Sequence, residues 1–559
     1  MKRLTTPILV LLLSLGGQGI LAQSRGAAAM AGSGARAGSG AASGQQEGPG
    51  RGTGGSGQMQ GLGSGRRPNI IFILSDDHAY QAISAYGSHL AETPNIDRIA
   101  REGAVFTRAM VTNSICGPSR ASLLTGKYSH KNGYTLNERK FNTDQPVFPS
   151  LLRDKGYQTA WIGKWHLGNL PKGFDYFRIL NGQGEYYNPD LIGPADTTRA
   201  EGYVTDIITQ LTENWLNGRD TSRPFFLVVG EKATHREWLP DIRDLGAYDD
   251  REFPLPAAFH DDYRGRRAAA DQDMTIARTM RLREDLKVHA DYEHSGIYNR
   301  FTPEQKKSFY DYYENKVSRE FDKRRDTGEA LLRWKYQRYI KDYLSVARSL
   351  DRNIGRLQQY LDEKGLTGNT VVIYGSDQGF FLGEHGWFDK RWIYEESLRT
   401  PFVMRFPGVI QPGSRVSAIT LNIDWAPTIL DIAGIATPAD MQGVSFLPLV
   451  DGRNGSPAKA VSAAGWRKAM YYHYYEYPQP HHVYPHFGVR TERYVLVRFY
   501  GPADFWELYD LDKDPHELKN VYGDAGYRKT VGELKMQLKQ LIRQYDDKEA
   551  EGILEREGR

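Results

Sequence analysis

The chain has 559 residues, of which 40% are hydrophobic, 25% charged and 12% aromatic. At ~150 residues per domain, this length allows several domains or one large α/β unit with an appendage, and it is enough to bury a large core. The 72 Lys and Arg residues nearly balance the 68 Asp and Glu residues, so the charge gives no reason to propose a nucleic-acid partner. Cys116 is the only cysteine, which excludes a disulfide framework and a thiolate metal cluster.

The N-terminus has the pattern of a secretory signal peptide. Lys2 and Arg3 precede an apolar run from Ile8 to Leu15, and small residues follow. This run is too short to span a membrane, and no other hydrophobic run reaches spanning length. We therefore predict a signal peptide over residues 1–23 and an exported protein, periplasmic or secreted, with no membrane span.

Residues 24–66 have a low-complexity composition of Gly, Ala, Ser and Gln with scattered Arg. Such a segment cannot bury enough apolar surface to offset its ordering entropy, so we predict a disordered linker. Folded sequence begins at Arg67. The runs 69–74, 225–229 and 371–374 are continuous and apolar, as is typical of strands buried on both faces.

Helices are predicted between these strands. Asn95–Arg108 and the long polar segment Thr302–Leu361 have helical character, and the second opens with Thr302-Pro303-Glu304-Gln305. That opening predicts a capping box with Pro in the first turn. Strands that alternate with helices favour the α/β class, with a mostly parallel sheet covered on both faces.

The sequence changes character after about Val450. Met470–Tyr477 and Arg493–Phe499 are aromatic and β-branched, and Glu533–Tyr545 has helical periodicity. We predict a large domain over residues 67–450. A smaller α+β domain over residues 451–559 is expected to contain antiparallel strands and a terminal helix.

Two of the predicted apolar strands end in acidic residues. Asp76 and Asp77 follow the first, and Asp377 and Gln378 follow the last. If these strands are parallel neighbours, their carboxyl ends bring three carboxylates and one amide oxygen together. Oxygen ligands of this kind suit Ca²⁺ or Mg²⁺ rather than zinc. The alternative is that acidic residues only begin the loops after strands, as Asp often does.

Cys116 stands at the start of a predicted helix. The sequence Gly117-Pro118 places Pro118 in the first turn, where free backbone N–H groups and the helix dipole stabilise an anion. Arg120 adds a positive charge. These features predict a reactive thiol with a lowered pKa, whereas the alternative is a buried, inert cysteine.

Cys116, Pro118 and Arg120, followed by Ala-Ser-Leu-Leu-Thr-Gly, closely resemble the signature of the formylglycine-dependent (type I) sulfatases. Gly156–His166 resembles the second signature of this family, and the acid-ended strands resemble its metal motifs. The resemblance covers roughly Arg67–Tyr522, with the motifs in the family's order. It implies an alkaline-phosphatase-like fold, in which helices sandwich a large, mixed, mostly parallel sheet and a smaller C-terminal α+β domain follows.

The resemblance also implies that residue 116 is the nucleophile. A formylglycine-generating enzyme would oxidise Cys116 to formylglycine during maturation, and the hydrated aldehyde would supply the attacking oxygen. Ca²⁺, rather than Mg²⁺, would be held by residue 116 together with Asp76, Asp77, Asp377 and Gln378. The family more often has Asn or His in place of Gln378, but Gln still offers an amide oxygen.

Three cations and two histidines complete the set that the resemblance implies. Arg120 would steady the deprotonated diol, and Lys164 and Lys390 would bind the sulfuryl oxygens. His166 would be the base that eliminates sulfate, and His235 the acid that protonates the leaving alcohol. Family members more often have Pro before this last histidine, where the chain has Thr, so a purely structural role for it is the alternative.

Segments outside the signatures resemble one subgroup of the family. Ser376–Pro401 and Arg490–Tyr494 are similar to bacterial N-acetylglucosamine-6-sulfatases. We therefore expect a sulfuric ester hydrolase that acts on a sulfated glycan, with the 6-O-sulfate of N-acetylglucosamine as the first candidate. Two alternatives are a phosphonate monoester or phosphodiester hydrolase with the same site, and a non-catalytic sulfoglycan-binding protein in which Cys116 stays unconverted.

Aromatic residues gather in the predicted smaller domain. Tyr471–Tyr477, with His481, His482 and His486, would suit a sugar subsite, because aromatic faces stack on sugars and imidazoles bind hydroxyls. The alternative is that these Tyr-rich strands pack the small domain against the large one.

Overall fold

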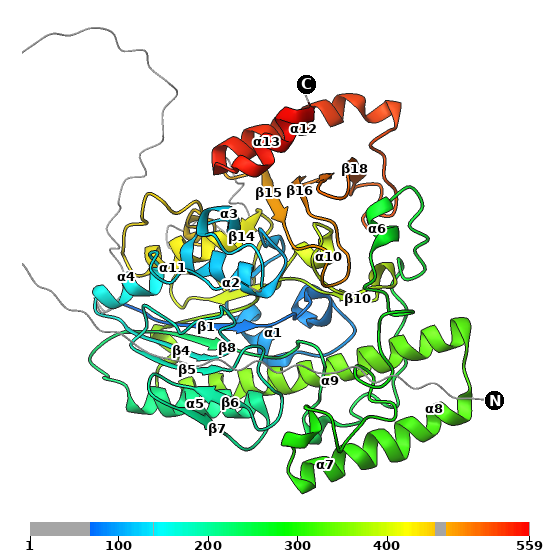
Figure 1. Cartoon of the computed structure of the whole chain (residues 1–559). Helices are drawn as coiled ribbons and strands as arrows, with labels where there is room; N and C mark the ends of the chain where they lie inside the picture. The colour runs from blue at the N-terminus through cyan, green and yellow to red at the C-terminus, as the bar shows by residue number, and fades with distance from the viewer. Residues whose placement is uncertain (1–66, 138, 453–464, 558–559) are drawn as a thin grey trace, which may run out of the picture. The chain divides into compact units, whose positions relative to one another are not determined.

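A ten-stranded mixed sheet is the largest element of the structure, a computed structural model that describes residues 67–137, 139–452 and 465–557 (Figure 1). The predicted signal peptide and linker lie outside the described residues. From one edge to the other, the strands are β13 (Ser414–Val416), β2 (Ala104–Phe106), β12 (Phe402–Arg405), β9 (Thr370–Ser376), β1 (Asn69–Ser75), β8 (Phe225–Gly230), β4 (Gln158–Gly163), β5 (Tyr176–Leu180), β6 (Asp190–Ile192) and β7 (Thr197–Arg199).

The centre of this sheet is parallel, as predicted. Strands β9, β1, β8, β4 and β5 pair in parallel, while β12, β6 and β7 run antiparallel to their neighbours. Every residue of β1, β8 and β9 is buried, which explains why these strands are continuous apolar runs rather than alternating ones.

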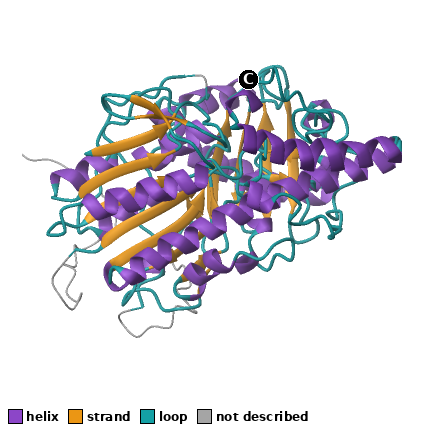
Figure 2. Cartoon of the chain, turned by 90° about the horizontal axis from the view of Figure 1, so that it is seen from below, coloured by secondary structure: helices purple, strands orange, loops and turns teal. Residues whose placement is uncertain are grey.

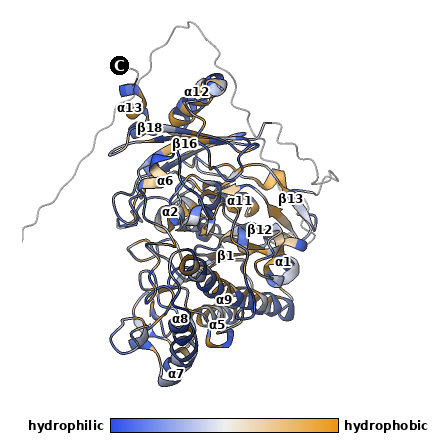
Figure 3. Cartoon of the chain, turned by 90° about the vertical axis from the view of Figure 1, so that its right-hand side faces the viewer, coloured by the Kyte–Doolittle hydropathy of each residue, from blue (hydrophilic) through white to orange (hydrophobic). Residues whose placement is uncertain are grey.

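Helices cover both faces of the sheet (Figures 2 and 3). Successive side chains of β1 alternate between the faces, so Ile71 and Ile73 enter one core while Phe72 and Leu74 enter the other. The first core is completed by α1 (Pro94–Arg101), α5 (Val204–Gly218) and α9 (Gly328–Glu363). The second core is completed by α2 (Cys116–Thr125), α4 (Phe148–Asp154) and α11 (Trp425–Ile432).

The helix predicted over Asn95–Arg108 is only half right. Helix α1 ends at Arg101, and Ala104–Phe106 forms β2 between β12 and β13. Gly103 allows the change of direction, since a Cβ there would lie 2.1 Å from the Met404 carbonyl oxygen. The helix therefore ends where the chain comes against the backbone of β12.

The long polar segment predicted over Thr302–Leu361 begins as expected, but it forms two helical rods. The first runs over residues 303–324, and the second is α9. The Thr302 hydroxyl accepts a hydrogen bond from the backbone N–H of Gln305, whose side chain in turn accepts from the backbone N–H of Thr302, which confirms the capping box. Helix α7 (Pro303–Phe309), the π-helical η5 (Tyr310–Ser318) and α8 (Arg319–Arg324) follow. Arg325 then adopts a left-handed φ of 51° and ends the rod before α9.

A four-stranded antiparallel sheet forms the C-terminal part. Its strands are β15 (Ala469–Tyr474), β16 (His486–Thr491), β17 (Tyr494–Phe499) and β18 (Phe505–Asp510), packed against α12 (Arg528–Tyr545) with α13 (Lys548–Glu557) following (Figure 1). The predicted antiparallel strands and terminal helix are confirmed. The described residues all belong to one compact unit, so the domain boundary at residue 450 stays a prediction.

Several short elements lie outside the two main sheets. They are β3 (Ala109–Met110) with β14 (Thr420–Leu421), β10 (Phe381–Leu382) with β11 (Phe388–Asp389), and the helices α3 (Ser129–Asn132), α6 (Arg267–Asp271) and α10 (Glu395–Leu398). In the part of the chain that the structure describes, no helix is both long and apolar enough to cross a membrane.

Candidate active site

Four neighbouring parallel strands direct their carboxyl ends to one place. In the order β9, β1, β8 and β4, the register aligns Ser376 with Ser75, Leu74 with Gly230, and Gly230 with Gly163. The loops after these strands hold the predicted residues, which are Asp377 and Gln378, Asp76 and Asp77, His235, and Lys164 and His166. The predicted convergence of the two acid-ended strands is therefore confirmed.

Three buried carboxylates form the centre of the site. One oxygen from each of Asp76, Asp77 and Asp377 lies within 4.8 Å of the others, and these side chains are almost fully buried. Burial raises the pKa of Asp77 to about 6, and burial with the Asp76 charge raises that of Asp377 to about 7. Gln378 directs its Nε2 to Asp77, while its buried Oε1 has no hydrogen-bond partner among the described residues. This all-oxygen set with one unpartnered amide oxygen fits a hard divalent cation.

Three cations of the chain face these carboxylates. Lys390 Nζ lies 2.7 and 2.6 Å from the two oxygens of Asp77, and Arg120 Nε donates to Asp377 Oδ2 at 2.9 Å. Lys164 pairs with Asp76. Arg120 Nη1 also donates to the Lys164 carbonyl at 2.9 Å, so these residues form one connected cluster. Each cation predicted at the site is thus present there.

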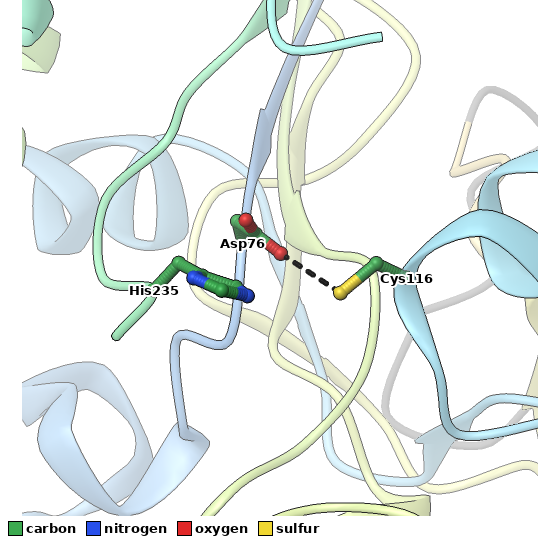
Figure 4. Close-up of side chains that lie close together, drawn as sticks. All are labelled: Asp76, Cys116 and His235. Atoms are coloured by element: carbon green, nitrogen blue, oxygen red, sulfur yellow. Dashed lines mark hydrogen bonds between the residues drawn. The ribbon is translucent and has the colours of Figure 1, made fainter. Parts of the chain in front are cut away.

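Cys116 is the first residue of α2 and points into the cluster (Figure 4). Its Sγ lies 3.3 Å from Asp76 Oδ1 and 3.6 Å from Gln378 Nε2. The expected low thiol pKa is wrong, because burial and the neighbouring Asp76 carboxylate raise the pKa of Cys116 well above its ordinary value. The helix N-terminus exists as predicted, but desolvation outweighs it.

His235 lies on the other side of Asp76 from Cys116 (Figure 4). Its Nε2 is 3.8 Å from Asp77 Oδ2, and its Nδ1 lies 2.6 Å from the Arg236 carbonyl oxygen. Burial, followed by the charge of Lys164, lowers the pKa of His235 well below its usual range and that of His166 to about 2. His166 Nδ1 is buried and has no hydrogen-bond partner among the described residues.

A clamp that the sequence analysis missed holds the segment around His235. Arg236 donates to both oxygens of Asp285, at 2.8 and 2.6 Å. Lys287 Nζ donates to the Trp238 carbonyl at 2.8 Å and to Asp342 Oδ2 at 3.0 Å, and both of these charged side chains are fully buried. These partners are far apart in the sequence, so no local pattern could have revealed them.

Gln183 is a second residue that the sequence analysis missed. Its Oε1 accepts from Lys164 Nζ at 2.5 Å, and Lys232 Nζ reaches its carbonyl oxygen at 3.4 Å. Burial and the charge of Lys164 lower the pKa of Lys232 to about 8. Gln183 therefore orients one of the cations that face Asp76.

The residues of the aromatic segment, Tyr471–Tyr477 with His481, His482 and His486, lie in two different environments. Tyr472 and His486 are buried, with ring centroids 5.5 Å apart, and Tyr472 belongs to the hydrophobic core of the C-terminal sheet. His481 instead lies beside the loop that carries Lys390, with Nε2 3.1 Å from Asp389 Oδ2. Arg391 pairs with that same carboxylate. Tyr472 and His486 thus pack as the alternative expected, whereas His481 lies next to the site.

Comparisons with known proteins agree with this geometry. The family model described as "Sulfatase" matches residues 68–435, and one described as "N-sulphoglucosamine sulphohydrolase, C-terminal" matches residues 383–544. The chain is 47% identical over 494 residues to an N-acetylglucosamine-6-O-sulfatase of Bacteroides thetaiotaomicron, covering 86% of the chain and 87% of that protein.

Solved structures of other proteins have the same fold as this chain. A protein determined in complex with its substrate D-glucosamine-2-N,6-O-disulfate matches with a TM-score of 0.83 and 46% identity, covering 86% of this chain and 99% of that one. The phosphonate monoester hydrolase of Agrobacterium radiobacter has a TM-score of 0.63 at 20% identity, over 86% and 96% of the two chains, and so shares the fold alone. Because the sulfatase model covers more than half of the chain, this protein belongs to the sulfatase family and is an enzyme that hydrolyses sulfate esters.

Proposed function

We propose that this sulfatase removes the 6-O-sulfate from N-acetylglucosamine or a related glucosamine unit of a sulfated glycan. The observation that carries the chemistry is the placement of Cys116 Sγ 3.3 Å from Asp76, at the edge of the three-carboxylate cluster. The choice of sugar is supported by the N-acetylglucosamine-6-O-sulfatase that shares 47% identity over nearly the whole of both chains.

Asp76, Asp77, Asp377, Gln378 and residue 116 are the proposed ligands of a Ca²⁺ ion. The oxygen donors of the three carboxylates and the unpartnered Gln378 Oε1 support this assignment, and three carboxylates with an amide oxygen and residue 116 favour the flexible coordination of Ca²⁺ over the stricter octahedron of Mg²⁺. When bound, the ion would polarise a sulfuryl oxygen beside the nucleophile, which would be the hydrated formylglycine that a formylglycine-generating enzyme makes from Cys116.

The cations of the chain would bind the sulfate group. Lys164 and Lys390 face the carboxylates now, and both are buried, where a fixed charge acts more strongly than in water. They would hold the sulfuryl oxygens as negative charge builds on them. Arg120, anchored on Asp377 and on the Lys164 carbonyl, would steady the charge at residue 116.

The two histidines would move protons. The Arg236 carbonyl oxygen accepts from His235 Nδ1, so Nε2 is the atom that would carry a proton to the leaving sugar oxygen. His166, half-buried with an unpartnered Nδ1, would be the base that serves sulfate elimination. Burial keeps both rings neutral at rest, so His166 is free to accept a proton, whereas His235 would first have to take up a proton on Nε2 before it could act as the acid.

Export is part of the proposal, because sulfated glycans are large extracellular polymers and the N-terminal sequence has a signal-peptide pattern. The signal segment lies outside the described residues.

The first experiment is the mass of the tryptic peptide Ala109–Arg120 from protein produced in its own host. Replacement of the thiol sulfur and two hydrogens by one aldehyde oxygen is the expected result. The converted protein should then release sulfate from N-acetylglucosamine-6-sulfate faster than it hydrolyses an aryl phosphonate. An unmodified thiol in native-source protein would instead favour a sulfoglycan-binding protein, and faster phosphonate hydrolysis would favour the phosphonate hydrolase.

A further inference from the structure

The carbonyl oxygen of Asp77 lies where three segments that are distant in the sequence meet. It accepts one hydrogen bond from Thr234 Oγ1 at 2.9 Å, in the loop after β8, and a second from Tyr343 Oη at 2.7 Å, on α9. Both of these side chains are fully buried. Because a carbonyl oxygen has two lone pairs, the two hydroxyl groups satisfy it completely.

The backbone of Asp77 adopts a conformation that needs such support. Its φ of 63° lies in the left-handed region, which is uncommon for residues with a side chain and persists only where surrounding contacts fix it. In this conformation the Asp77 N–H donates to Asp377 Oδ1 at 3.3 Å, and the Asp77 carboxylate pairs with Lys390. The place of this carboxylate in the cluster therefore depends on the hydrogen bonds that hold its carbonyl.

Thr234 binds the turn after β1 through its backbone as well as its side chain. The Thr234 N–H donates to the Asp76 carbonyl at 2.7 Å, and the Asp76 N–H donates to the Ala233 carbonyl at 3.0 Å. A proline at position 234 could supply neither the N–H nor the hydroxyl group. The next residue is His235, whose Nε2 lies 3.8 Å from Asp77 Oδ2. Thr234 thus ties the loop of the proposed acid to the loop that carries two of the carboxylates.

Tyr343 fixes the same turn to the long helix α9. Its Oη accepts from the backbone N–H of Ala79 at 2.8 Å while it donates to the Asp77 carbonyl, so one hydroxyl group bridges both sides of the turn. Its ring stacks on Phe380, with centroids 6.0 Å apart and an interplanar angle of 16°. Phe380 lies in the loop after β9, which also carries Gln378. Tyr343 therefore contacts the loops that follow both acid-ended strands.

We propose that Thr234 and Tyr343 are positioning residues that hold Asp77 in the conformation of a metal ligand and, through its carbonyl oxygen, link it to the loop of His235. The inference rests on the proposed function, because it takes Asp77 as a ligand and His235 as the acid. It adds that cation binding and the placement of the acid depend on one shared hydrogen-bond acceptor.

Calorimetric titration of chelator-treated protein with Ca²⁺ tests the effect on the ligand. Thr234→Val and Tyr343→Phe each remove one hydroxyl group with little change of shape, and each should raise the dissociation constant for Ca²⁺ about tenfold. The double variant should raise it more than about a hundredfold, because the buried carbonyl then loses both partners. Thr234→Ser, which keeps the hydroxyl group, should bind Ca²⁺ as the wild type does.

Two substitutions of the same kind serve as matched controls. Thr212→Val removes a buried hydroxyl group on α5 that has no hydrogen-bond partner among the described residues. Tyr336→Phe removes a buried hydroxyl group on α9 that donates to the Pro254 carbonyl at 2.9 Å, in a loop that carries none of the proposed ligands. Both should keep the wild-type affinity for Ca²⁺. The proposal is overturned if Thr234→Val and Tyr343→Phe bind Ca²⁺ as these controls do.

Turnover of two sulfate esters at saturating Ca²⁺ tests the link to His235. For converted Thr234→Val protein, kcat on N-acetylglucosamine-6-sulfate should fall about five- to tenfold, whereas an aryl sulfate, whose leaving group needs no acid, should lose less than about twofold. Equal losses on the two esters would reject the link to the acid.

The titration needs no turnover, so it separates this inference from the proposed function. Wild-type protein that binds Ca²⁺ but releases no sulfate after conversion, while the variants bind Ca²⁺ more weakly, would reject only the proposed reaction. Unchanged Ca²⁺ affinity in both variants would reject the positioning role even if the wild type is an active sulfatase. A wild type that binds no Ca²⁺ would reject both the ligand assignment and this inference.

Discussion

At the scale of single residues, the site is a balance between carboxylates and cations that the chain supplies itself. Lys390 and Arg120 each neutralise one carboxylate, and burial still raises the pKa of Asp77 and Asp377. A divalent ion would relieve this repulsion and free the lysines for substrate. Gln378 is the proposed ligand that can be tested most directly, because its buried Oε1 has no hydrogen-bond partner among the described residues.

This balance predicts that Ca²⁺ stabilises the chelator-treated protein more than Mg²⁺ does. Saturation at about 100 times the dissociation constant would raise the free energy of unfolding by about 2.7 kcal/mol. Gln378→Ala should require about tenfold more Ca²⁺ for the same rise in Tm, because one ligand is lost. Gln540→Ala, on the exposed side of α12, should behave as the wild type. The ligand assignment fails if neither ion shifts Tm or if the two variants respond alike.

At the scale of elements, the loop after β8 shows how His235, the proposed acid, is positioned by residues from distant parts of the chain. The backbone carbonyl of Arg236 holds His235, and the Arg236 side chain is itself held by Asp285. Although burial acts to raise the pKa of Asp285, hydrogen bonds from Arg236 keep it below its ordinary value, so this carboxylate stays charged. The Arg236–Asp285 ion pair therefore fixes the orientation of the His235 ring through the Arg236 carbonyl.

Asp285→Asn is expected to misplace His235 and so to impair protonation of poor leaving groups. The value of kcat for N-acetylglucosamine-6-sulfate should fall at least about tenfold, whereas an aryl sulfate, whose leaving group needs no acid, should lose much less. Asp362→Asn is the matched control, since it breaks an Arg98–Asp362 pair of similar geometry (2.8 and 3.2 Å) that is exposed at the end of α9. Parallel losses on both esters would show that Asp285 serves only the fold.

At the scale of the whole molecule, the C-terminal sheet and the large-sheet part share a core and one buried charge network. Ile115 and Trp392 pack with Tyr472 and Phe499 in the same cluster. Asp547, at the turn between α12 and α13, accepts from Tyr471 at 2.9 Å, and its Oδ2 lies 2.7 Å from His473 Nδ1 and 3.2 Å from His130 Nδ1 of α3. The carboxyl-terminal helices are thereby tied to the C-terminal sheet and to α3.

This network predicts a pH-dependent contribution to stability. Burial acts to raise the pKa of Asp547, but His473 and its hydrogen bond outweigh burial and lower it. A carboxyl group whose pKa is depressed in the folded state stabilises fully above its unfolded pKa of about 3.9 and loses that contribution as pH falls below it. Asp547→Asn should therefore lower the free energy of unfolding by about 2 kcal/mol at pH 7, as measured by urea denaturation. The difference from the wild type should shrink below about pH 4, and a difference that persists there would contradict the assignment.

Much of the fold and of the catalytic set could be predicted from local patterns. The apolar runs that became β1, β8 and β9 and the capping box at Thr302 are encoded within a few residues of sequence. The helix predicted over 95–108 failed in its second half, because pairing of β2 with β12 and β13 overrode the helical pattern. Propensity is a weak guide where another strand competes for the backbone.

The sequence by itself determined which residues gather at the proposed site, since Cys116 at a helix start and acids after two strands follow from short-range order and from the carboxyl-end rule for parallel sheets. Only the tertiary structure decided their environment. Burial beside Asp76 reversed the expected thiol pKa, Asp285 reached Arg236 across 49 residues, and Tyr475 and Tyr477 separated from the packed core to line a cavity. Desolvation and long-range contacts depend on what the rest of the chain places around a side chain, and no local pattern records that.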